Sequence, residues 1–243
     1  MNPAMWISKT GVQAQDAKLQ AIANNLANVN TTGFKRDRAV FTDLFYQIDQ
    51  QPGAPRDANT TSPTGVQLGN GTRLVGTQKV FSNGSVQTTG QSLDVAIVGS
   101  GFLQVTMPNG DIGYTRAGQL QLSSEGRLVN AQGLPLRPEI TIPANAMTVT
   151  FGRDGTVSAE LSTGQAQVLG TIQLARFVNP GGLESRGQNL LKETPSSGTP
   201  QVLQPGVTGA GTLMQGTLEA SNVNVVEEMV NMIETQRAYE INS

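Results

Sequence analysis

Apolar residues in the first thirty positions recur at spacings that alternate between four and three. This repeat of about 3.5 residues is typical of a helix that packs lengthwise against other helices in a coiled coil. We expect the helix to end near Asn30, with Gly33 supplying the turn that follows. The apolar seam contains Val12, Leu19, Ile22, Leu26 and Val29.

The C-terminal residues predict a second helix. Asn224 is an N-cap candidate, and Glu227 follows it three residues later, as in a capping box. Its two neighbouring apolar stripes consist of Val226, Val230 and Ile233, and of Val225, Met229 and Met232. A helix that is apolar over so wide an arc needs more than one neighbour. We expect the two terminal helices to pair with each other and with other copies of the chain; the alternative is that both pack on the central domain.

Asparagine is unusually frequent beside both helices. Because a buried amide must be hydrogen-bonded, we expect these side chains to bond one another and the helix ends, and so to fix the register between subunits. The alternative is that they are solvated and fray the helix ends. The set consists of Asn24, Asn25, Asn28, Asn222, Asn224 and Asn231.

Between the helices, residues 66–177 alternate between short apolar runs and turn residues. Asn83–Gly84, Asn109–Gly110 and Asp154–Gly155 are each typical of a hairpin turn. Residues 50–71 and 193–211 are rich in Pro, Gly and Thr, and we expect both to be irregular. The predicted fold class is α+β: terminal helices paired as a coiled coil, a central β-rich domain resembling a sandwich or open barrel, and an irregular connector.

Composition narrows the range of functions. The chain of 243 residues contains no cysteine and no histidine, which excludes thiolate and imidazole chemistry. A net charge of −2, with 14% charged residues, provides no basic surface for nucleic acid. The N-terminal residues do not have the pattern of a cleavable signal peptide, and no apolar run approaches the roughly 20 residues of a membrane span.

Candidate catalytic motifs are weak. Gly99–Gln104 contains G-x-G without the third glycine of a dinucleotide fingerprint, and Gly152–Ser158 lacks the ligand spacing of a calcium loop. The carboxylates considered as a glycosidase pair are Asp94, Asp111, Glu125 and Asp154. All four lie in turn-like contexts, where acidic residues are ordinary. We therefore expect no enzyme activity, no cofactor and no small-molecule substrate.

Three stretches carry a family resemblance. They are "LQAIANNLANVNTTGFKRDRAVFTDLF" at 19–45, "LDVAIVGSGFLQV" at 93–105 and "GTLEASNVNVVEEMVNMIETQRAYEINS" at 216–243. All three resemble the bacterial flagellar rod and hook family. The chain length and "TTSPTGVQLGNG" at 60–71 are most like the members that build the distal rod. A sibling rod subunit or the hook subunit is the alternative within the family.

The resemblance implies a structural subunit that polymerises into a rigid helical tube and transmits motor torque. It implies export without a cleavable signal peptide, through the flagellar export apparatus, to a rod that spans the periplasm and reaches the outer membrane. The implied partners are other copies of the chain, proximal rod subunits, the hook subunit and the P-ring and L-ring proteins. Relatives in the family usually continue beyond the match to Asn242, so we expect this chain to be truncated.

The resemblance also implies three domains. Residues 1–34 with 220–243 form the helical coiled coil, 35–74 with 192–219 form a connector containing an extra bracing stretch, and 75–191 form an outer β domain. The expected subunit-interface residues are Val12, Leu19, Ile22, Asn25, Leu26, Asn28, Val29, Asn222, Val226, Met229, Val230 and Ile233. Two other classes remain as alternatives. A cell-wall-binding β module needs an exposed aromatic or carboxylate-lined groove, and a peptidoglycan hydrolase needs a working carboxylate pair.

Overall fold

The computed structural model describes residues 3–53, 55–57, 60–61, 64–162, 164–207 and 209–242. The chain divides into two compact units. The helical unit consists of Met1–Ala27, Asp37–Gln78 and Asn224–Ser243, and the β unit consists of Asn28–Arg36 and Lys79–Val223. Each unit therefore contains segments from both ends of the chain.

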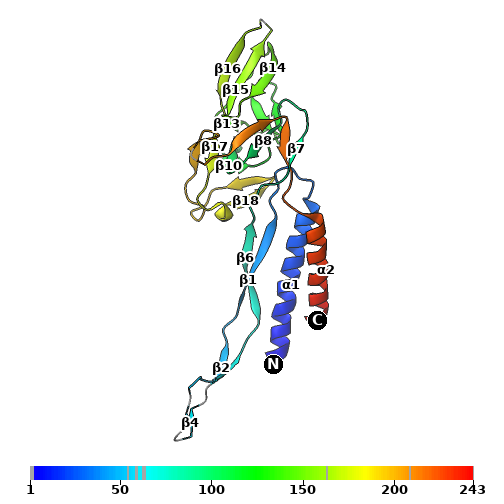
Figure 1. Ribbon diagram of the computed structural model, residues 1–243, viewed down its shortest axis with the longest axis vertical. Helices are drawn as coiled ribbons and strands as arrows, with labels where there is room; N and C mark the ends of the chain where they lie inside the picture. Colours follow the sequence, from blue (N-terminus) through cyan, green and yellow to red (C-terminus); the bar gives the residue numbers. More distant parts are fainter. Residues whose placement is uncertain are drawn as a thin grey trace. The chain divides into compact units, whose positions relative to one another are not determined.

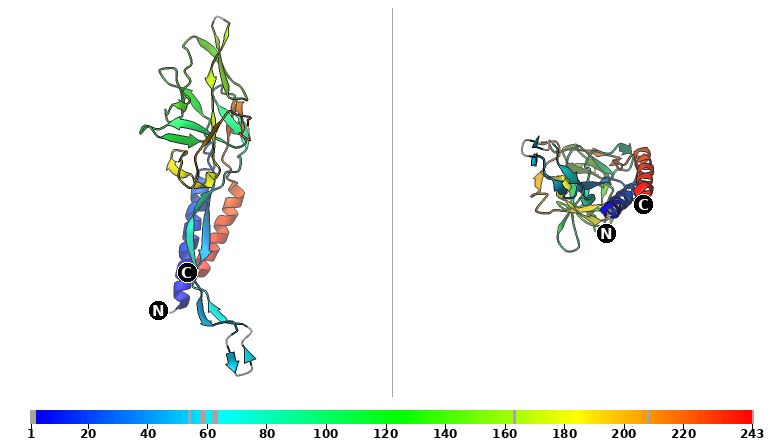
Figure 2. Two further views of the ribbon diagram at one scale, coloured as in Figure 1. Left: turned by 90° about the vertical axis from the view of Figure 1, so that its left-hand side faces the viewer. Right: turned by 90° about the horizontal axis from the view of Figure 1, so that it is seen from below.

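Helices α1 (Pro3–Ala27) and α2 (Val225–Asn242) lie side by side in the helical unit (Figures 1 and 2). Both predicted terminal helices are confirmed. Asn224 caps α2 as predicted, because its Oδ1 accepts a hydrogen bond from the backbone N–H of Val226 at 3.1 Å. None of the described helices is long and apolar enough to span a membrane.

Helix α1 ends at Ala27, slightly before the expected Asn30. A turn replaces the last predicted helical residues, because the Thr31 N–H donates to the Asn28 carbonyl and the Thr31 hydroxyl donates to the Asn28 side chain. Local side-chain bonding of this kind is the usual reason that asparagine stops a helix.

The rest of the helical unit is a two-stranded ribbon. Strand β1 (Asp37–Asp43) pairs with β6 (Thr72–Lys79), β2 (Gln47–Gln50) with β5 (Val66–Leu68), and β3 (Pro55–Asp57) with β4 (Thr60–Thr61). The expectation that residues 50–71 are irregular is therefore wrong in part. The short alternating segment Val66–Leu68 forms a strand because Gln47–Gln50 supplies an antiparallel partner, with Gln47 opposite Leu68.

The β unit is built around a seven-stranded sheet. Its order is β18 (Glu184–Gly187), β19 (Leu190–Lys192), β10 (Ile112–Thr115), β9 (Phe102–Thr106), β17 (Leu174–Arg176) and β20 (Gln201–Leu203), and β13 (Leu136–Arg137) also pairs with β9. Strand β20 lies within residues 193–211, so the expectation that this stretch is irregular is also wrong in part.

Smaller sheets complete the unit. Strands β14 (Ala146–Phe151), β15 (Thr156–Leu161) and β16 (Ala166–Thr171) form a three-stranded sheet. The two-stranded sheets are β11 (Leu120–Leu122) with β12 (Leu128–Asn130), β8 (Val95–Val98) with β21 (Thr212–Gln215), and β7 (Val86–Thr88) with β22 (Thr217–Glu219). A short 3-10 helix spans Pro180–Gly182. Within the described ranges the sheets do not close into a barrel.

Two of the three predicted hairpins are confirmed. Asn109–Gly110 joins β9 to β10, and Asp154–Gly155 joins β14 to β15. The hairpin predicted at Asn83–Gly84 is wrong, because the strands on either side pair with β1 and β22 instead. Gly84 serves a close approach of two backbones: a Cβ on it would lie 1.9 Å from the Ala220 carbonyl oxygen.

Two apolar clusters form the core of the β unit. The larger one includes Val95, Leu103, Val105, Leu136 and Leu174, all fully buried. The smaller one is aromatic, with Phe102, Tyr114 and Phe177 in edge-to-face contact. The apolar run Val95–Val98 forms strand β8, with only its last residue exposed.

Candidate subunit interface

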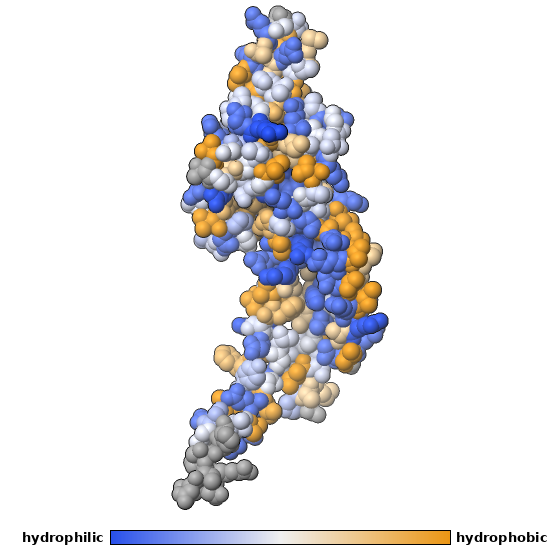
Figure 3. All heavy atoms as spheres, viewed as in Figure 1, coloured by the Kyte–Doolittle hydropathy of each residue, from blue (hydrophilic) through white to orange (hydrophobic). Residues whose placement is uncertain are grey.

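Helix α2 buries two polar side chains and exposes several apolar ones. Polar Glu228 and Thr235 are buried, with 3% and 1% of their surface exposed. Apolar Val226, Val230 and Ile233 are 69%, 50% and 52% exposed. Figure 3 shows apolar side chains gathered along α2. The helical unit therefore buries two polar residues of α2 and leaves an apolar stripe uncovered.

We define the α2 stripe as Val226, Met229, Val230, Ile233 and Ile241, which are all between 49% and 85% exposed. Complete burial of such a side chain stabilises by about 1.5–3 kcal/mol. At half exposure, each residue therefore retains roughly 1 kcal/mol of unused transfer free energy. An uncovered apolar row of this kind, next to polar residues, is typical of an interaction surface.

Asn25 holds the buried side of α2 against α1 and β1. Its Nδ2 donates to the Asp37 carbonyl at 2.9 Å, and its Oδ1 accepts from the Asp37 N–H at 2.8 Å. The same Nδ2 lies 3.4 Å from Oε2 of Glu228 on α2. The Asn25 amide thus bonds both backbone groups of Asp37, at the start of the ribbon, and also reaches Glu228 on α2. These hydrogen bonds explain why an asparagine can be buried here.

The N-terminal part of α1 is also apolar and exposed. Met5 and Trp6 are 72% and 50% exposed, whereas Thr10 is buried. The Thr10 hydroxyl donates to the Ile7 carbonyl at 2.8 Å and accepts from the Thr72 N–H at 3.4 Å. A polar contact therefore fixes α1 to the ribbon, while its first turns present apolar surface outward.

The predicted interface residues fall into three groups. Exposed positions are Val226, Met229, Val230 and Ile233. Half-buried positions are Val12, Leu19, Leu26, Asn28, Val29 and Asn222, and buried positions are Ile22 and Asn25. Only the α2 residues are openly available to a second copy. Whether the others also contact a neighbouring subunit stays a prediction.

Asn222 bonds within the β unit. Its Oδ1 accepts from the Arg36 N–H at 2.8 Å, and its Nδ2 donates to the Val80 carbonyl at 2.8 Å and to the Ser82 carbonyl at 3.2 Å. These bonds join the segment that follows α1 to the segment that precedes α2. In the described structure, Asn25 and Asn222 therefore connect distant parts of one chain.

A buried ionic cluster lies in the same part of the β unit. Glu219 accepts from Lys35 Nζ at 2.6 Å, from Arg116 Nη1 at 3.2 Å and from the Gly84 N–H at 2.9 Å. All three charged side chains are at most 4% exposed. Burial lowers the pKa of Lys35 and of Arg116, and Glu219 opposes both shifts. The sequence analysis missed this cluster. The available signal was that two of the charged residues each follow an apolar residue: Lys35 follows Phe34, and Glu219 follows Leu218.

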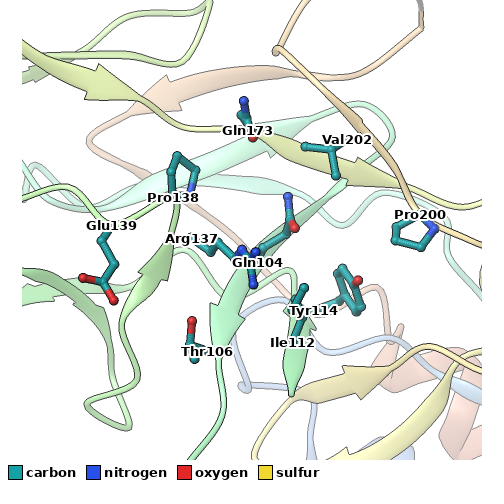
Figure 4. Close-up of a pocket in the computed structure, with 10 residues that line it drawn as sticks. All are labelled: Gln104, Thr106, Ile112, Tyr114, Arg137, Pro138, Glu139, Gln173, Pro200 and Val202. Atoms are coloured by element: carbon teal, nitrogen blue, oxygen red, sulfur yellow. The ribbon is translucent and has the colours of Figure 1, made fainter. Parts of the chain in front are cut away.

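A cleft of about 600 Å³ opens on the seven-stranded sheet (Figure 4). It lies where β9 changes partner from β17 to β13, and its lining includes Gln104, Tyr114, Arg137 and Glu139. Burial raises the pKa of Tyr114, and Glu193, which accepts its hydroxyl hydrogen bond at 3.1 Å, raises it further.

The cleft lacks the groups that a cell-wall-binding module requires. Tyr114 is fully buried, and Phe102, Phe151 and Phe177 are each at most 5% exposed. No aromatic face is therefore available there to stack on a sugar ring, and Glu139 is the single carboxylate among the lining residues that the structure describes.

The candidate glycosidase carboxylates have separate local partners. Asp94 accepts from the Thr89 hydroxyl, Asp111 pairs with Lys192, Glu125 with Arg127, and Asp154 with Thr156. Each of these carboxylates therefore bonds a neighbour in a turn or in a surface ion pair, and none has another of the four as its partner.

Three family profiles match the chain. Residues 6–35 match the flagella basal body rod protein family, residues 96–159 match the flagellar hook protein FlgE/F/G D1 domain, and residues 214–243 match the flagellar basal body rod FlgEFG protein C-terminal family. These matches cover both terminal helices and much of the β unit.

Curated relatives are similar over the whole of this chain and over more than nine-tenths of their own length. The chain is 54% identical to the flagellar basal-body rod protein FlgG of Buchnera aphidicola subsp. Schizaphis graminum, over 100% of this chain and 94% of that protein. It is 45% identical to FlgG of Borreliella burgdorferi, over 100% of this chain and 93% of that protein. A solved structure, the Helicobacter pylori flagellar hook protein FlgE2, is 14% identical over 76% of this chain and 43% of that chain; its TM-score of 0.26 carries no argument.

Proposed function

The chain belongs to the family of flagellar basal-body rod proteins and is a structural subunit of that rod, and we propose that it builds the distal part of the rod. In this proposal many copies form a rigid helical tube that acts as a drive shaft and transmits torque to the hook. The protein is not an enzyme, because its family is one of structural rod proteins.

The exposed α2 stripe is the observation that carries the proposed polymer. Val226, Val230 and Ile233 recur at the spacing of a coiled-coil seam, yet they face away from the chain's own polar contacts. A second copy that covers this stripe removes apolar surface from water, which is the main favourable term in association. The terminal helices are then the inner, coiled-coil layer of the tube.

The proposal retains the three-domain division. Residues 1–34 with 220–243 form the helical layer, 35–74 with 192–219 the connector, and 75–191 an outward-facing β domain. Tyr46–Gly71, which contains the β2–β5 pair, is the proposed brace between neighbouring subunits. Phe45 and Tyr46 at its start are 94% and 53% exposed, as expected of a surface that a neighbour covers.

The proposed partners follow from the place of a distal rod. They are other copies of this chain, proximal rod subunits, the hook subunit and the P-ring and L-ring proteins around the rod. In this proposal the flagellar export apparatus delivers the unfolded chain, and the rod spans the periplasm and reaches the outer membrane.

Assembly in cells that lack the natural subunit tests the polymer. Val230→Asp places a carboxylate on the α2 stripe, and Val178→Asp does the same at a position of the β unit that is 83% exposed. We expect Val230→Asp to abolish incorporation into isolated basal bodies, because a buried unpaired charge costs several kcal/mol. Val178→Asp should assemble. Normal incorporation of Val230→Asp would contradict the proposed interface.

An epitope distinguishes the distal rod from other members of the family. The sequence predicts a turn at Thr163–Gly164 that would suit an epitope, but Thr163 lies outside the described residues. We therefore place the epitope in the β9–β10 turn at Gly110, where nothing lies within 4 Å of an added Cβ. Immunogold label along the rod at the level of the rings supports the proposal. Label on the hook or on the cell-proximal rod would show that the chain is another member of the family than the distal rod subunit.

A further inference from the structure

The cleft on the seven-stranded sheet contains a largely buried amide that has no partner. Gln104 on β9 is 4% exposed, and in the described part of the chain its side-chain amide forms no hydrogen bond. Figure 4 shows this amide in the middle of the residues that line the cleft. Because Arg116 Nε is the single fully buried side-chain atom without a partner among the described residues, the Gln104 amide reaches the open space of the cleft. A ligand there would supply the bonds that this amide lacks.

The same cleft contains a cation without a counterion. Arg137, at the end of β13, lies opposite Gln104 in the β9–β13 pair. Its guanidinium is exposed and takes part in no ion pair or side-chain hydrogen bond within the described ranges. The positive charge of Arg137 opposes the rise in the pKa of Tyr114, so this charge acts inside the cleft.

The acidic residues near the cleft have partners of their own. Oε2 of Glu139, the single carboxylate among the described lining residues, lies 3.6 Å from Arg127 Nη1. Glu193 accepts the hydrogen bond of the Tyr114 hydroxyl and is not part of the lining. The unpaired charge of the cleft is therefore positive. A planar guanidinium matches a carboxylate, which can accept two of its N–H groups at once.

The size and the walls of the cleft suit a short piece of extended chain. Its volume of about 600 Å³ is within the roughly 300–1,000 Å³ of pockets that enclose a ligand. Gln173, directly before β17, adds a second amide whose side chain has no partner among the described residues. Each amide offers a donor and an acceptor, as a peptide group requires. The apolar walls are Ile112, Pro138, Pro200 and Val202.

We propose that this cleft binds a short extended segment of a partner protein that carries an Asp or Glu side chain. The carboxylate accepts hydrogen bonds from Arg137, and the amides of Gln104 and Gln173 bond the peptide groups beside it. The apolar walls contact the flanking side chains. This site lies entirely in the β unit and does not include the α2 stripe, so it is independent of the proposed polymer contact.

Nuclear magnetic resonance of the isotope-labelled full chain tests the site, because the side-chain NH₂ groups of Gln104 and Gln173 give signals of their own. The probe is N-acetylglutamate α-amide, which has one carboxylate and two peptide groups. N-acetylglutamine amide has the same shape without the charge, and acetate has the charge without the peptide groups. We expect the glutamate probe to shift both side-chain signals to saturation, and the other two to bind at least about fivefold more weakly.

Two variants locate the response. Arg137→Gln removes the unpaired guanidinium and should weaken binding of the glutamate probe by about fivefold or more. The matched control, Arg186→Gln, removes a guanidinium that pairs with Glu184 outside the cleft lining and should leave the affinity unchanged.

Three results would overturn the proposal. Equal affinities for the glutamate and glutamine probes, or for the unaltered chain and Arg137→Gln, would remove the role of the carboxylate. Acetate binding as tightly as the glutamate probe would assign the cleft to simple anions. Side-chain signals of Gln104 and Gln173 that do not move with the glutamate probe would show that the cleft does not bind such a segment.

Discussion

Replacement of Glu219 by Gln should strongly destabilise the β unit. Glu219 is 1% exposed and is the carboxylate that compensates Lys35 and Arg116. Glu219→Gln keeps the shape of the side chain and one acceptor oxygen, which can still bond the Gly84 N–H. The substitution therefore isolates the loss of negative charge from the loss of packing.

The structure sets the size of the effect. Removing one partner of a buried ion pair costs about 3–5 kcal/mol, because it leaves an uncompensated charge. Here two cations lose their partner, but the pKa of Lys35 is already lowered by burial, and loss of its proton limits the penalty. We therefore expect a loss of about 3–5 kcal/mol, which lowers the Tm of a unit of this size by roughly 6–20 °C.

Urea and thermal unfolding of the purified full chain measure this loss. Asp111→Asn is the matched control, because Asp111 and Lys192 form an ion pair whose side chains are 41% and 31% exposed, and exposed pairs contribute little. If Glu219→Gln destabilised the chain no more than Asp111→Asn, the conclusion that Glu219 compensates two buried cations would be refuted.

Three further substitutions give independent tests. The pKa of Tyr114 is raised in the folded state, so the stability that its neutral hydroxyl contributes is complete below about pH 10 and is lost as the pH rises further. Tyr114→Phe should cost about 1 kcal/mol of stability at neutral pH. In urea titrations at about pH 8–12, the same variant should not show the alkaline loss of stability. Gly33→Ala should destabilise by about 3–5 kcal/mol by calorimetry, because φ is 68° and a Cβ would lie 2.7 Å from the Arg116 carbonyl carbon, whereas Gly110→Ala, with φ 84° and open space, should lose only about 1 kcal/mol. Asn25→Ala removes the side-chain hydrogen bonds to both Asp37 backbone groups, and hydrogen exchange should show the Asp37 amide less protected by about 1–3 kcal/mol, while an unchanged rate would contradict the bridging role.

Local patterns predicted the helical parts of the fold well. The N-cap at Asn224 and the seam of Val226, Val230 and Ile233 depend on residues three or four apart, and such signals are complete within the sequence. The apolar residues of this helix cover so wide an arc that one neighbour was not expected to cover them all. The terminal helices and the candidate interface on α2 were therefore accessible to sequence reasoning.

Long-range contacts explain what the sequence analysis missed. Asn83–Gly84 has the local pattern of a hairpin, but Gly84 is required by the approach of Ala220 from the other end of the chain. The bond between Lys35 and Glu219 joins residues 184 positions apart. No periodicity encodes such a pair, and only the close succession of apolar and charged residues indicated that a charge was buried.

The asparagines show the same limit. Their frequency beside the helices correctly indicated a need for hydrogen bonding, but the partners were not deducible. Asn25 bonds the backbone of Asp37, and Asn222 bonds the backbone of Arg36, Val80 and Ser82. Backbone groups carry no sequence signal, so the sequence could indicate the demand for partners without identifying them.

Cysteine accessibility tests the central claim, that neighbouring subunits cover the α2 stripe. The chain contains no cysteine, so Ile233→Cys introduces a single thiol at a position that is 52% exposed. Val178→Cys, at a position that is 83% exposed in the β unit, is the control. We expect a maleimide reagent to label both variants in the monomer, but only Val178→Cys in isolated rods. Equal labelling of Ile233→Cys in monomers and rods would contradict the account.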